Sequence, residues 1–264
     1  MCHDPVVSAE NDPNVRSLAA HYVSAARSIT VLTGAGISTD SGIPDFRGPN
    51  GLWVKDPDAE RLSNIRYYLA EPDLRRKAWQ NRLNTPMWTA QPNVGHRSLH
   101  HLAATGTLRS LVTQNVDGLH QAAGHPDDQV IEVHGSIYRS ACWDCGDRRP
   151  MQETLDRVRA GDPDPACERC GGILKSDTIS FGQSLVPEVI AAAMRAAEQC
   201  DLLLAVGTTL GVYPVANMVP RARANGARVI ILNGEPTKMD RLADAVVLGD
   251  IARELPALVG YPVH

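Results

Sequence analysis

The sequence is poor in aromatic residues, which make up 5% of it, and only two of its 264 residues are phenylalanine. It contains no apolar run near the ~20 residues of a membrane span, which argues against an integral membrane protein. The net charge is −4, so no overall positive field favours nucleic acid as a partner. Residues 1–14 lack the apolar block of a secretory signal and are expected to form a flexible tail. Hydrophobic residues make up 43%, enough for the core of a globular protein.

Four of the six cysteines form two Cys-x-x-Cys pairs, each beside a glycine. The pairs are Cys142 with Cys145 and Cys167 with Cys170. This spacing is typical of a closed four-cysteine zinc site, which has a structural and not a catalytic role. Two disulfides or free thiols are the alternative. Without a signal peptide the metal is favoured, and the reducing cytoplasm is the expected compartment.

Short apolar segments alternate with helical patterns along most of the chain. This alternation predicts an α/β fold, a Rossmann-like parallel sheet with helices on both faces. Strands are expected over 29–32, 108–113, 130–133, 178–181, 202–206, 228–232 and 245–248. Helices are expected over 14–27, 73–83, 95–104, 187–199 and 215–224, with a last one from 251.

Changes in residue composition along the sequence divide the chain into several units. The Rossmann-like domain is expected to be discontinuous, over 15–48, 95–138 and 176–264. Residues 49–94, rich in proline, tryptophan and paired arginine, are expected to form a helical module. Residues 139–175, poor in core residues, are expected to form a small zinc-binding module.

Polar, glycine-rich segments follow five of the expected strands. They begin at Gly34, Gln114, His134, Gly207 and Asn233. The carboxyl ends of parallel strands meet at one edge of a sheet, where open α/β folds bind ligands. We therefore expect one site at this edge.

The segment 33–48 is the most informative of the five. Gly34 and Gly36 follow a buried strand, as in loops whose backbone approaches a pyrophosphate. Taken alone this is a weak signal, because Thr39 stands where the dinucleotide fingerprint has its third glycine. The residues that follow, 43–48, put an acid, an aromatic and a base in succession, which favours a ligand-binding loop over a plain surface turn.

His134 ends a strand at the same edge. An imidazole there suits general-base chemistry near neutral pH, and a purely structural histidine is the alternative. Thr208 and Thr209, with Asn233 and Glu235, could bind phosphate, ribose or adenine groups. Ordinary turn capping is the alternative for these.

Several motifs in order resemble those of the sirtuin family of bacterial NAD-dependent protein deacylases. They are residues 34–38, 42–48, 113–120, 134–135, the two cysteine pairs, 181–182 and 207–210, and the resemblance covers about residues 15–260. It implies an NAD-dependent protein-lysine deacylase, most simply a deacetylase. Such an enzyme releases nicotinamide, free lysine and O-acyl-ADP-ribose through an alkylimidate.

The resemblance also implies roles for individual residues. His134 would be the general base, and Asn115 would share the catalytic site with it. NAD would be bound as co-substrate by Gly34, Ala35, Gly36, Ser38, Ile43, Asp45, Phe46, Arg47, Gln114, Asn115, Asp117, His134, Gly207, Thr208, Thr209, Asn233, Glu235, Asp250 and Ile251. The acyl-lysine tunnel would be lined by Phe46, Ile179, Phe181 and Val212, so both phenylalanines fall at tunnel positions.

The chain departs from the family pattern near the substrate. Relatives that remove acidic acyl groups carry a Tyr-x-x-Arg pair, whereas the matching residues here are Trp79 and Arg82, so acetyl is the better candidate. Ser176 and Gln183 replace the commoner proline and glutamate, which leaves the peptide preference open. Acyl-lysine proteins are the expected partners of a monomer, without nucleic acid or membrane. The alternatives are a protein ADP-ribosyltransferase and a non-catalytic zinc-ribbon module.

Overall fold

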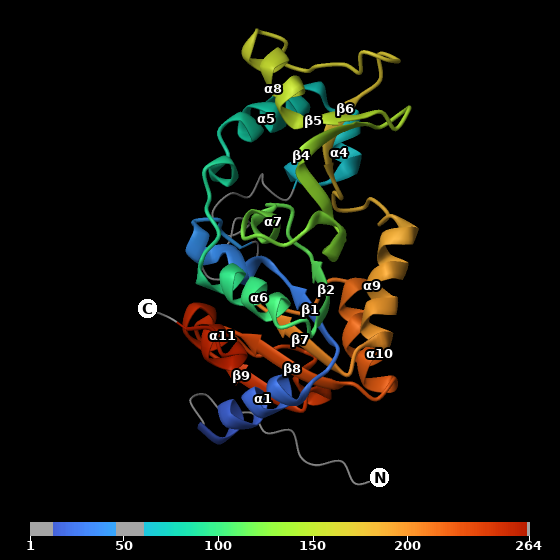
Figure 1. Ribbon diagram of the computed structural model, residues 1–264. Helices are drawn as coiled ribbons and strands as arrows, with labels where there is room; N and C mark the ends of the chain where they lie inside the picture. Colours follow the sequence, from blue (N-terminus) through green and yellow to red (C-terminus); the bar gives the residue numbers. More distant parts are fainter. Residues whose placement is uncertain (1–12, 46–60, 263–264) are drawn as a thin grey trace.

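The computed structural model describes residues 13–45 and 61–262 and contains two sheets (Figure 1). The larger sheet has six parallel strands in the order β3-β2-β1-β7-β8-β9. The strands are β1 (Ile29–Thr33), β2 (Leu108–Thr113), β3 (Val130–Glu132), β7 (Leu202–Val206), β8 (Arg228–Asn233) and β9 (Ala245–Leu248). This order, with its reversal between β1 and β7, is that of the doubly wound dinucleotide-binding fold. The α/β prediction is confirmed.

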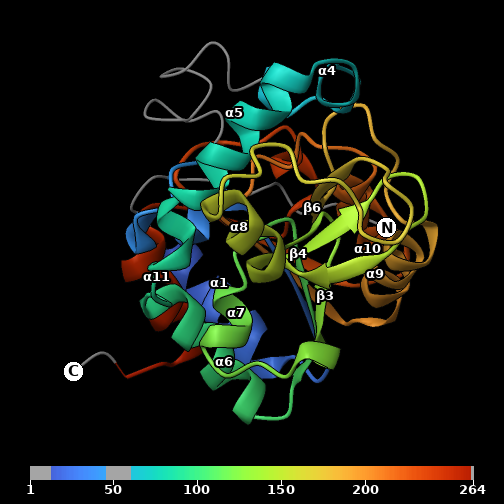
Figure 2. The ribbon, with the colours of Figure 1, turned by 90° about the horizontal axis from the view of Figure 1, so that it is seen from above.

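Helices cover both faces of this sheet, as Figure 2 shows from above. One face packs on α9 (Pro187–Gln199) and α10 (Met218–Ala224), the other on α1 (Pro13–Ala25), α6 (Val94–Ala104) and α11 (Ile251–Val259). Side chains of β7 alternate between the two cores: Leu203 faces α9 and α10, whereas Leu204 faces the other layer. A strand buried on both faces needs apolar residues at every position, which explains its unbroken apolar run.

A second unit stands at the opposite end of the molecule from α1 (Figure 1). Its antiparallel sheet has the order β5-β4-β6, formed by β4 (Gly135–Cys142), β5 (Arg148–Pro150) and β6 (Leu174–Thr178). The helices α4 (Ile65–Ala70), α5 (Pro72–Leu83) and α8 (Met151–Arg159) pack near it. Trp79 of α5, fully buried, shares one core with Leu155 of α8 and with Cys142 and Cys167.

Three expectations about individual segments need correction. The strand expected over 178–181 is wrong, because β6 ends at Thr178 and Phe181 makes only an isolated bridge to Asn64. The segment 139–175 is not poor in core, because α8 buries four of its side chains. The helix expected over 215–224 begins as a 3₁₀ turn, η4 (Val215–Asn217), before α10.

The remaining short elements are connections. They are η1 (Ala35–Ser41), η2 (Pro86–Trp88), α7 (Leu119–Ala122), η3 (Asp127–Gln129) and η5 (Asp240–Leu242). The expected tail, residues 1–14, lies almost wholly outside the described residues, and so do Phe46 and Arg47. The division of the chain into domains stays a prediction, and the antiparallel sheet reaches from Gly135 to Thr178 across two of its boundaries.

Candidate active site

Three glycines bring the ends of β1 and β7 into direct backbone contact at the reversal of the strand order. The Gly36 N–H donates to the Gly207 carbonyl over 2.9 Å. A Cβ on Gly34 would lie 2.8 Å from that carbonyl oxygen, and a Cβ on Gly207 only 2.5 Å from the Ile37 nitrogen. Gly207 also has φ +63°, a conformation that favours glycine. The three glycines therefore form a turn without side chains, in which backbone N–H groups can come close to a pyrophosphate at this edge.

A buried polar network lies just below this turn. The Ser38 hydroxyl donates to Asp117 Oδ2 over 2.8 Å and accepts from Asn115 Nδ2 over 3.0 Å. Asn115 Nδ2 also lies 3.2 Å from the Gly34 carbonyl, and Leu119 N–H donates to Asp117 Oδ1. Burial raises the pKa of Asp117, while these hydrogen bonds to the carboxylate act against that rise. Three side chains predicted to bind NAD are thus held as one unit.

His96 joins this network, a role for which the sequence gives no direct signal. It is fully buried, and its Nε2 lies 3.4 Å from Ser38 Oγ. Its other ring nitrogen closes a capping box with Asn93 at the start of α6. Burial lowers the pKa of His96 to about 3, so its ring is neutral.

His134 stands at the carboxyl end of β3, half-buried, with its ring fixed by Gln114. Its Nδ1 lies 2.9 Å from the Gln114 backbone carbonyl. Because a carbonyl oxygen only accepts, Nδ1 must carry the proton, and Nε2 then presents its lone pair. Burial lowers the pKa of His134, and the hydrogen bond to Gln114 offsets part of that effect. The geometry gives a neutral imidazole with a defined tautomer, suited to accept a proton.

The groups predicted for the rest of the cofactor lie along the same edge. Gln114 Nε2 donates to Thr208 Oγ1 over 2.9 Å, Asn233 Nδ2 donates to the Glu235 carbonyl, and Asp250 caps α11. Thr208 is buried, whereas Thr209 and Glu235 are exposed. The other predicted positions on this edge are Ala35 in η1, Ile43, which is buried beside Ser38, Asp45, and Ile251, which lies against the Gly207 turn.

The expected tunnel residues that the structure describes, Ile179, Phe181 and Val212, lie on two segments. Ile179 N–H donates to the His134 carbonyl over 2.8 Å, so this segment is tied to the histidine. Phe181 is 39% exposed, and Val212 is half-buried beside Tyr213, which is 61% exposed. Phe181 and Tyr213 thus leave apolar surface exposed on these two segments.

The four predicted cysteines come together in the second unit. Their sulfur atoms lie within 4.8 Å of one another, with 3.5 Å between Cys142 and Cys170 and 3.8 Å between Cys145 and Cys167. Four thiolates at ~2.3 Å around one zinc would be about 3.8 Å apart, whereas a disulfide would need ~2 Å. The donor set therefore fits a tetrahedral zinc ion.

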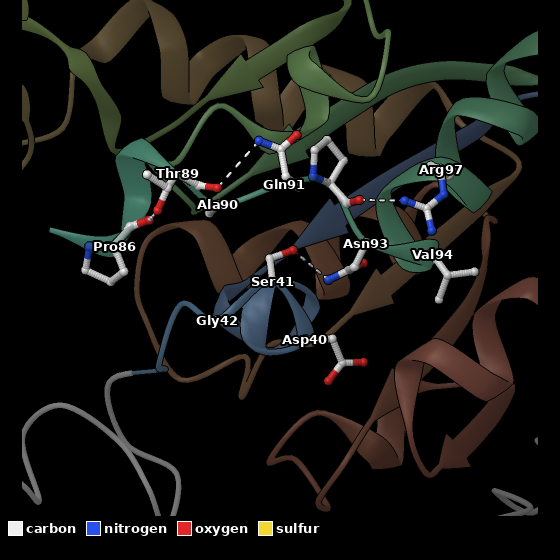
Figure 3. A pocket seen from close by; sticks show the side chains of 11 residues that line it. Asp40, Ser41, Gly42, Pro86, Thr89, Ala90, Gln91, Asn93, Val94 and Arg97 are labelled. Atoms are coloured by element: carbon white, nitrogen blue, oxygen red, sulfur yellow. Dashed lines mark hydrogen bonds between the residues drawn. The ribbon is translucent and has the colours of Figure 1, made fainter.

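One pocket, of about 670 Å³, lies between the end of η1 and the segment before α6 (Figure 3). Asn93 Nδ2 donates to Ser41 Oγ across it over 3.0 Å, and Arg97 holds the Pro92 carbonyl. None of the predicted site residues lines it.

Both the sequence and the structure are similar to those of known proteins. A sequence model described as "Sir2 family" matches residues 34–214. A protein of Streptomyces coelicolor named NAD-dependent protein deacetylase 2 is 46% identical over 231 residues, 88% of this chain and 96% of that protein. A structure on the mechanism and regulation of Sir2 enzymes superposes with a TM-score of 0.83 at 33% identity, covering 94% of this chain and 96% of that one. A Sir2 structure with a p53 peptide and NAD⁺ gives 0.80 at 28% identity, covering 92% and 97%.

Proposed function

The chain belongs to the Sir2 family and is an NAD-dependent protein deacetylase, and we propose that His134 is the general base of its reaction. The observation that carries this proposal is the hydrogen bond from Nδ1 to the Gln114 carbonyl, which leaves Nε2 free to take a proton. Among the described residues no hydrogen bond to Nε2 is found. His134 would take the proton from a ribose hydroxyl of bound NAD, so that this oxygen can attack the activated acyl group.

The bare glycine turn supports our assignment of the cofactor residues. Gly34, Gly36 and Gly207 leave room where any Cβ would collide, so backbone N–H groups can approach a pyrophosphate. We assign Ser38, Ile43, Asp45, Asn115 and Asp117 to the nicotinamide end, Gln114 to its ribose, and Thr208, Thr209, Asn233, Glu235, Asp250 and Ile251 to the adenosine half. NAD supplies the electrophilic ribose carbon, while the protein orients it and excludes water.

We assign the acyl-lysine to the segment after β6, where the backbone of Ile179 is tied to His134. Acetyl is our preferred acyl group. Arg82 supports this choice, because its guanidinium is already engaged with Ser176 Oγ and stacked over the rings of Tyr68 and Trp79. An acidic acyl group would have to displace these contacts.

Zinc would be held by Cys142, Cys145, Cys167 and Cys170, where it stabilises the fold and leaves no open coordination position. We further infer a monomer, because one chain supplies every group of the site. The four thiolates, which require a reducing compartment, support the cytoplasm. None of the helices in the described part of the chain has the length and hydrophobicity needed to cross a bilayer.

Mass spectrometry of the products tests the reaction. The purified chain, mixed with NAD and an acetyl-lysine peptide, should give free lysine, nicotinamide and O-acetyl-ADP-ribose in equal amounts. An ADP-ribosyltransferase would instead attach ADP-ribose to the peptide or protein and leave the acetyl group in place. That outcome would overturn the proposal.

A further inference from the structure

Four histidines form a file that runs inward from the surface between α6 and α7. The order is His100, His125, His120, His96, with ring centroids 5.4, 5.9 and 5.0 Å apart. His100 is exposed, whereas the other three rings are at most 3% exposed. We call these four residues the histidine file.

Three buried nitrogens of the histidine file have no hydrogen-bond partner within the described residues: both of His125 and Nδ1 of His120. His120 Nε2 lies 2.9 Å from Thr33 Oγ1, which itself donates to Thr113 Oγ1. Thr33 Oγ1 therefore accepts from Nε2, and Nδ1 of His120 must be a bare lone pair. An unsatisfied buried polar atom is costly, so three in one cluster call for an explanation.

The loop after α7 is shaped to hold His100 against this cluster. Gly124 has φ +110°, and a Cβ there would lie 2.9 Å from His100 Cε1, with the two ring nitrogens next nearest. The His125 N–H donates to the His120 carbonyl, which fixes the next residue of the loop. A side chain at position 124 would thus push the outer imidazole away from the inner ones.

We propose that His100, His125 and Nδ1 of His120 bind a divalent transition-metal ion such as Co²⁺, Ni²⁺ or Zn²⁺, separate from the four-cysteine site. Imidazole nitrogen is a preferred ligand of these ions. Two imidazoles that share an ion at ~2.1 Å have ring centroids roughly 5–6 Å apart, which matches both outer spacings.

The site is not assembled before the ion binds. Within residues 13–45 and 61–262, only the four cysteines form a group of three or more metal-binding side chains whose ligand atoms lie within 4.8 Å of one another. The histidines therefore do not yet converge on one point. His100 is exposed and can turn toward His125. His120 is oriented by Thr33 through its other nitrogen, the arrangement usual for a metal-bound histidine. Burial lowers the pKa values of His120 and His125, the latter to about 4, so both are neutral ligands at pH 7.

Occupancy of this site would reach the active site through hydrogen bonds. His120 holds Thr33, Thr33 donates to Thr113, and Thr113 Oγ1 accepts from the Asn115 N–H over 3.1 Å. An ion on the other nitrogen of His120 therefore acts through three successive hydrogen bonds on the backbone of Asn115.

Titration of the zinc-loaded full chain with Co²⁺ tests the proposal. Bound metal is counted after equilibrium dialysis, and the visible spectrum distinguishes imidazole from thiolate ligands. We expect one equivalent of Co²⁺ beyond the retained zinc, without a thiolate charge-transfer band. His100→Gln, an exposed change that should leave folding intact, and His125→Gln should each lose this equivalent. His21→Gln, at an exposed position of α1, is the matched control and should keep it.

Two outcomes would overturn the proposal. One is that the wild-type chain, with zinc retained, binds no further Co²⁺ at pH 7.5. The other is that His100→Gln and His125→Gln, both shown to be folded by their thermal melts, bind the extra equivalent as the wild type does.

Discussion

At the scale of single residues, the proposed role of His134 as general base predicts the pH dependence of the reaction. Its burial lowers its pKa below the ordinary ~6.5, so the neutral, proton-accepting form persists into mildly acidic solution. We expect kcat/KM to fall on the acidic side with an apparent pKa below 6.5, as protonation removes the base. A pH profile of kcat/KM for NAD, with the peptide saturating, measures it. An acidic limb centred above pH 6.5 would contradict the assignment.

Gly135, next to that histidine, carries a second prediction. Its φ is +74°, and a Cβ there would lie 2.0 Å from the Asp177 carbonyl oxygen. Gly135→Ala therefore combines the left-handed strain of about 1–2 kcal/mol with a backbone collision, and should lower both stability and activity. Gly226→Ala is the matched control, because Gly226 has φ +87° but open space around it. If Gly135→Ala and Gly226→Ala lose the same free energy of unfolding in urea, small shifts of the neighbouring backbone relieve the collision at Gly135, and the prediction is wrong.

At the scale of elements, the zinc site supports α5 as well as its own sheet. Cys142 and Cys167 share a core with Trp79 of α5 and Leu155 of α8. We expect Cys142→Ser to lose zinc and to raise hydrogen exchange in α5, because metal binding is coupled to folding. Cys200→Ala, in the core of the larger sheet, should keep its zinc. A zinc-free Cys142→Ser variant with wild-type exchange in α5 would refute this coupling.

The corner between α6 and α7 should be sensitive to acid. Burial lowers the pKa of His96 to about 3 and of His125 to about 4, so both stay neutral in the fold while the unfolded chain binds protons below pH 6.5. Each such histidine therefore reduces the free energy of unfolding, by at most ~1.4 kcal/mol per pH unit, as pH falls from 6.5 toward 4. Asp117, with its raised pKa, acts in the opposite direction.

The contribution of His125 can be measured by comparing the free energy of unfolding in urea at pH 7 and at pH 5. His125→Gln removes a group that must stay neutral, so it should lose less stability between the two pH values than the wild type. His21→Gln, at an exposed position of α1, should leave the difference unchanged. The same loss in His125→Gln as in the wild type would mean that His125 does not titrate as its burial requires.

At the scale of the whole molecule, the parallel sheet could be predicted because most of its strands can be recognised from their own short sequences. Residues 202–206 and 245–248 coincide with β7 and β9, since strands buried on both faces are apolar throughout. Residues 108–113 coincide with β2, which is buried only in its second half. The position of the site could also be predicted, because the carboxyl ends of parallel strands meet at one edge of the sheet. Gly34, Gln114, His134 and Gly207 accordingly come together there.

The second unit could not be predicted as well, because its elements depend on contacts between distant segments. β4 and β6 are rich in polar residues and lack an unbroken apolar run, and their register comes from pairing with each other. Lys175, for example, is buried in β6 because its ammonium donates to the carbonyls of Ser176 and Thr178. The contact of His96 with Ser38 likewise joins α6 to η1, and only the fold brings these together.

The central claim is that His134 is the general base, and one comparison tests it most directly. His134→Ala should reduce deacetylation of an acetyl-lysine peptide by about 10²–10⁴-fold, the usual contribution of such a base. NAD binding, measured separately by calorimetry, should persist, because the glycine turn and the Ser38–Asp117 network remain. Wild-type deacetylation by the folded His134→Ala variant would contradict the account.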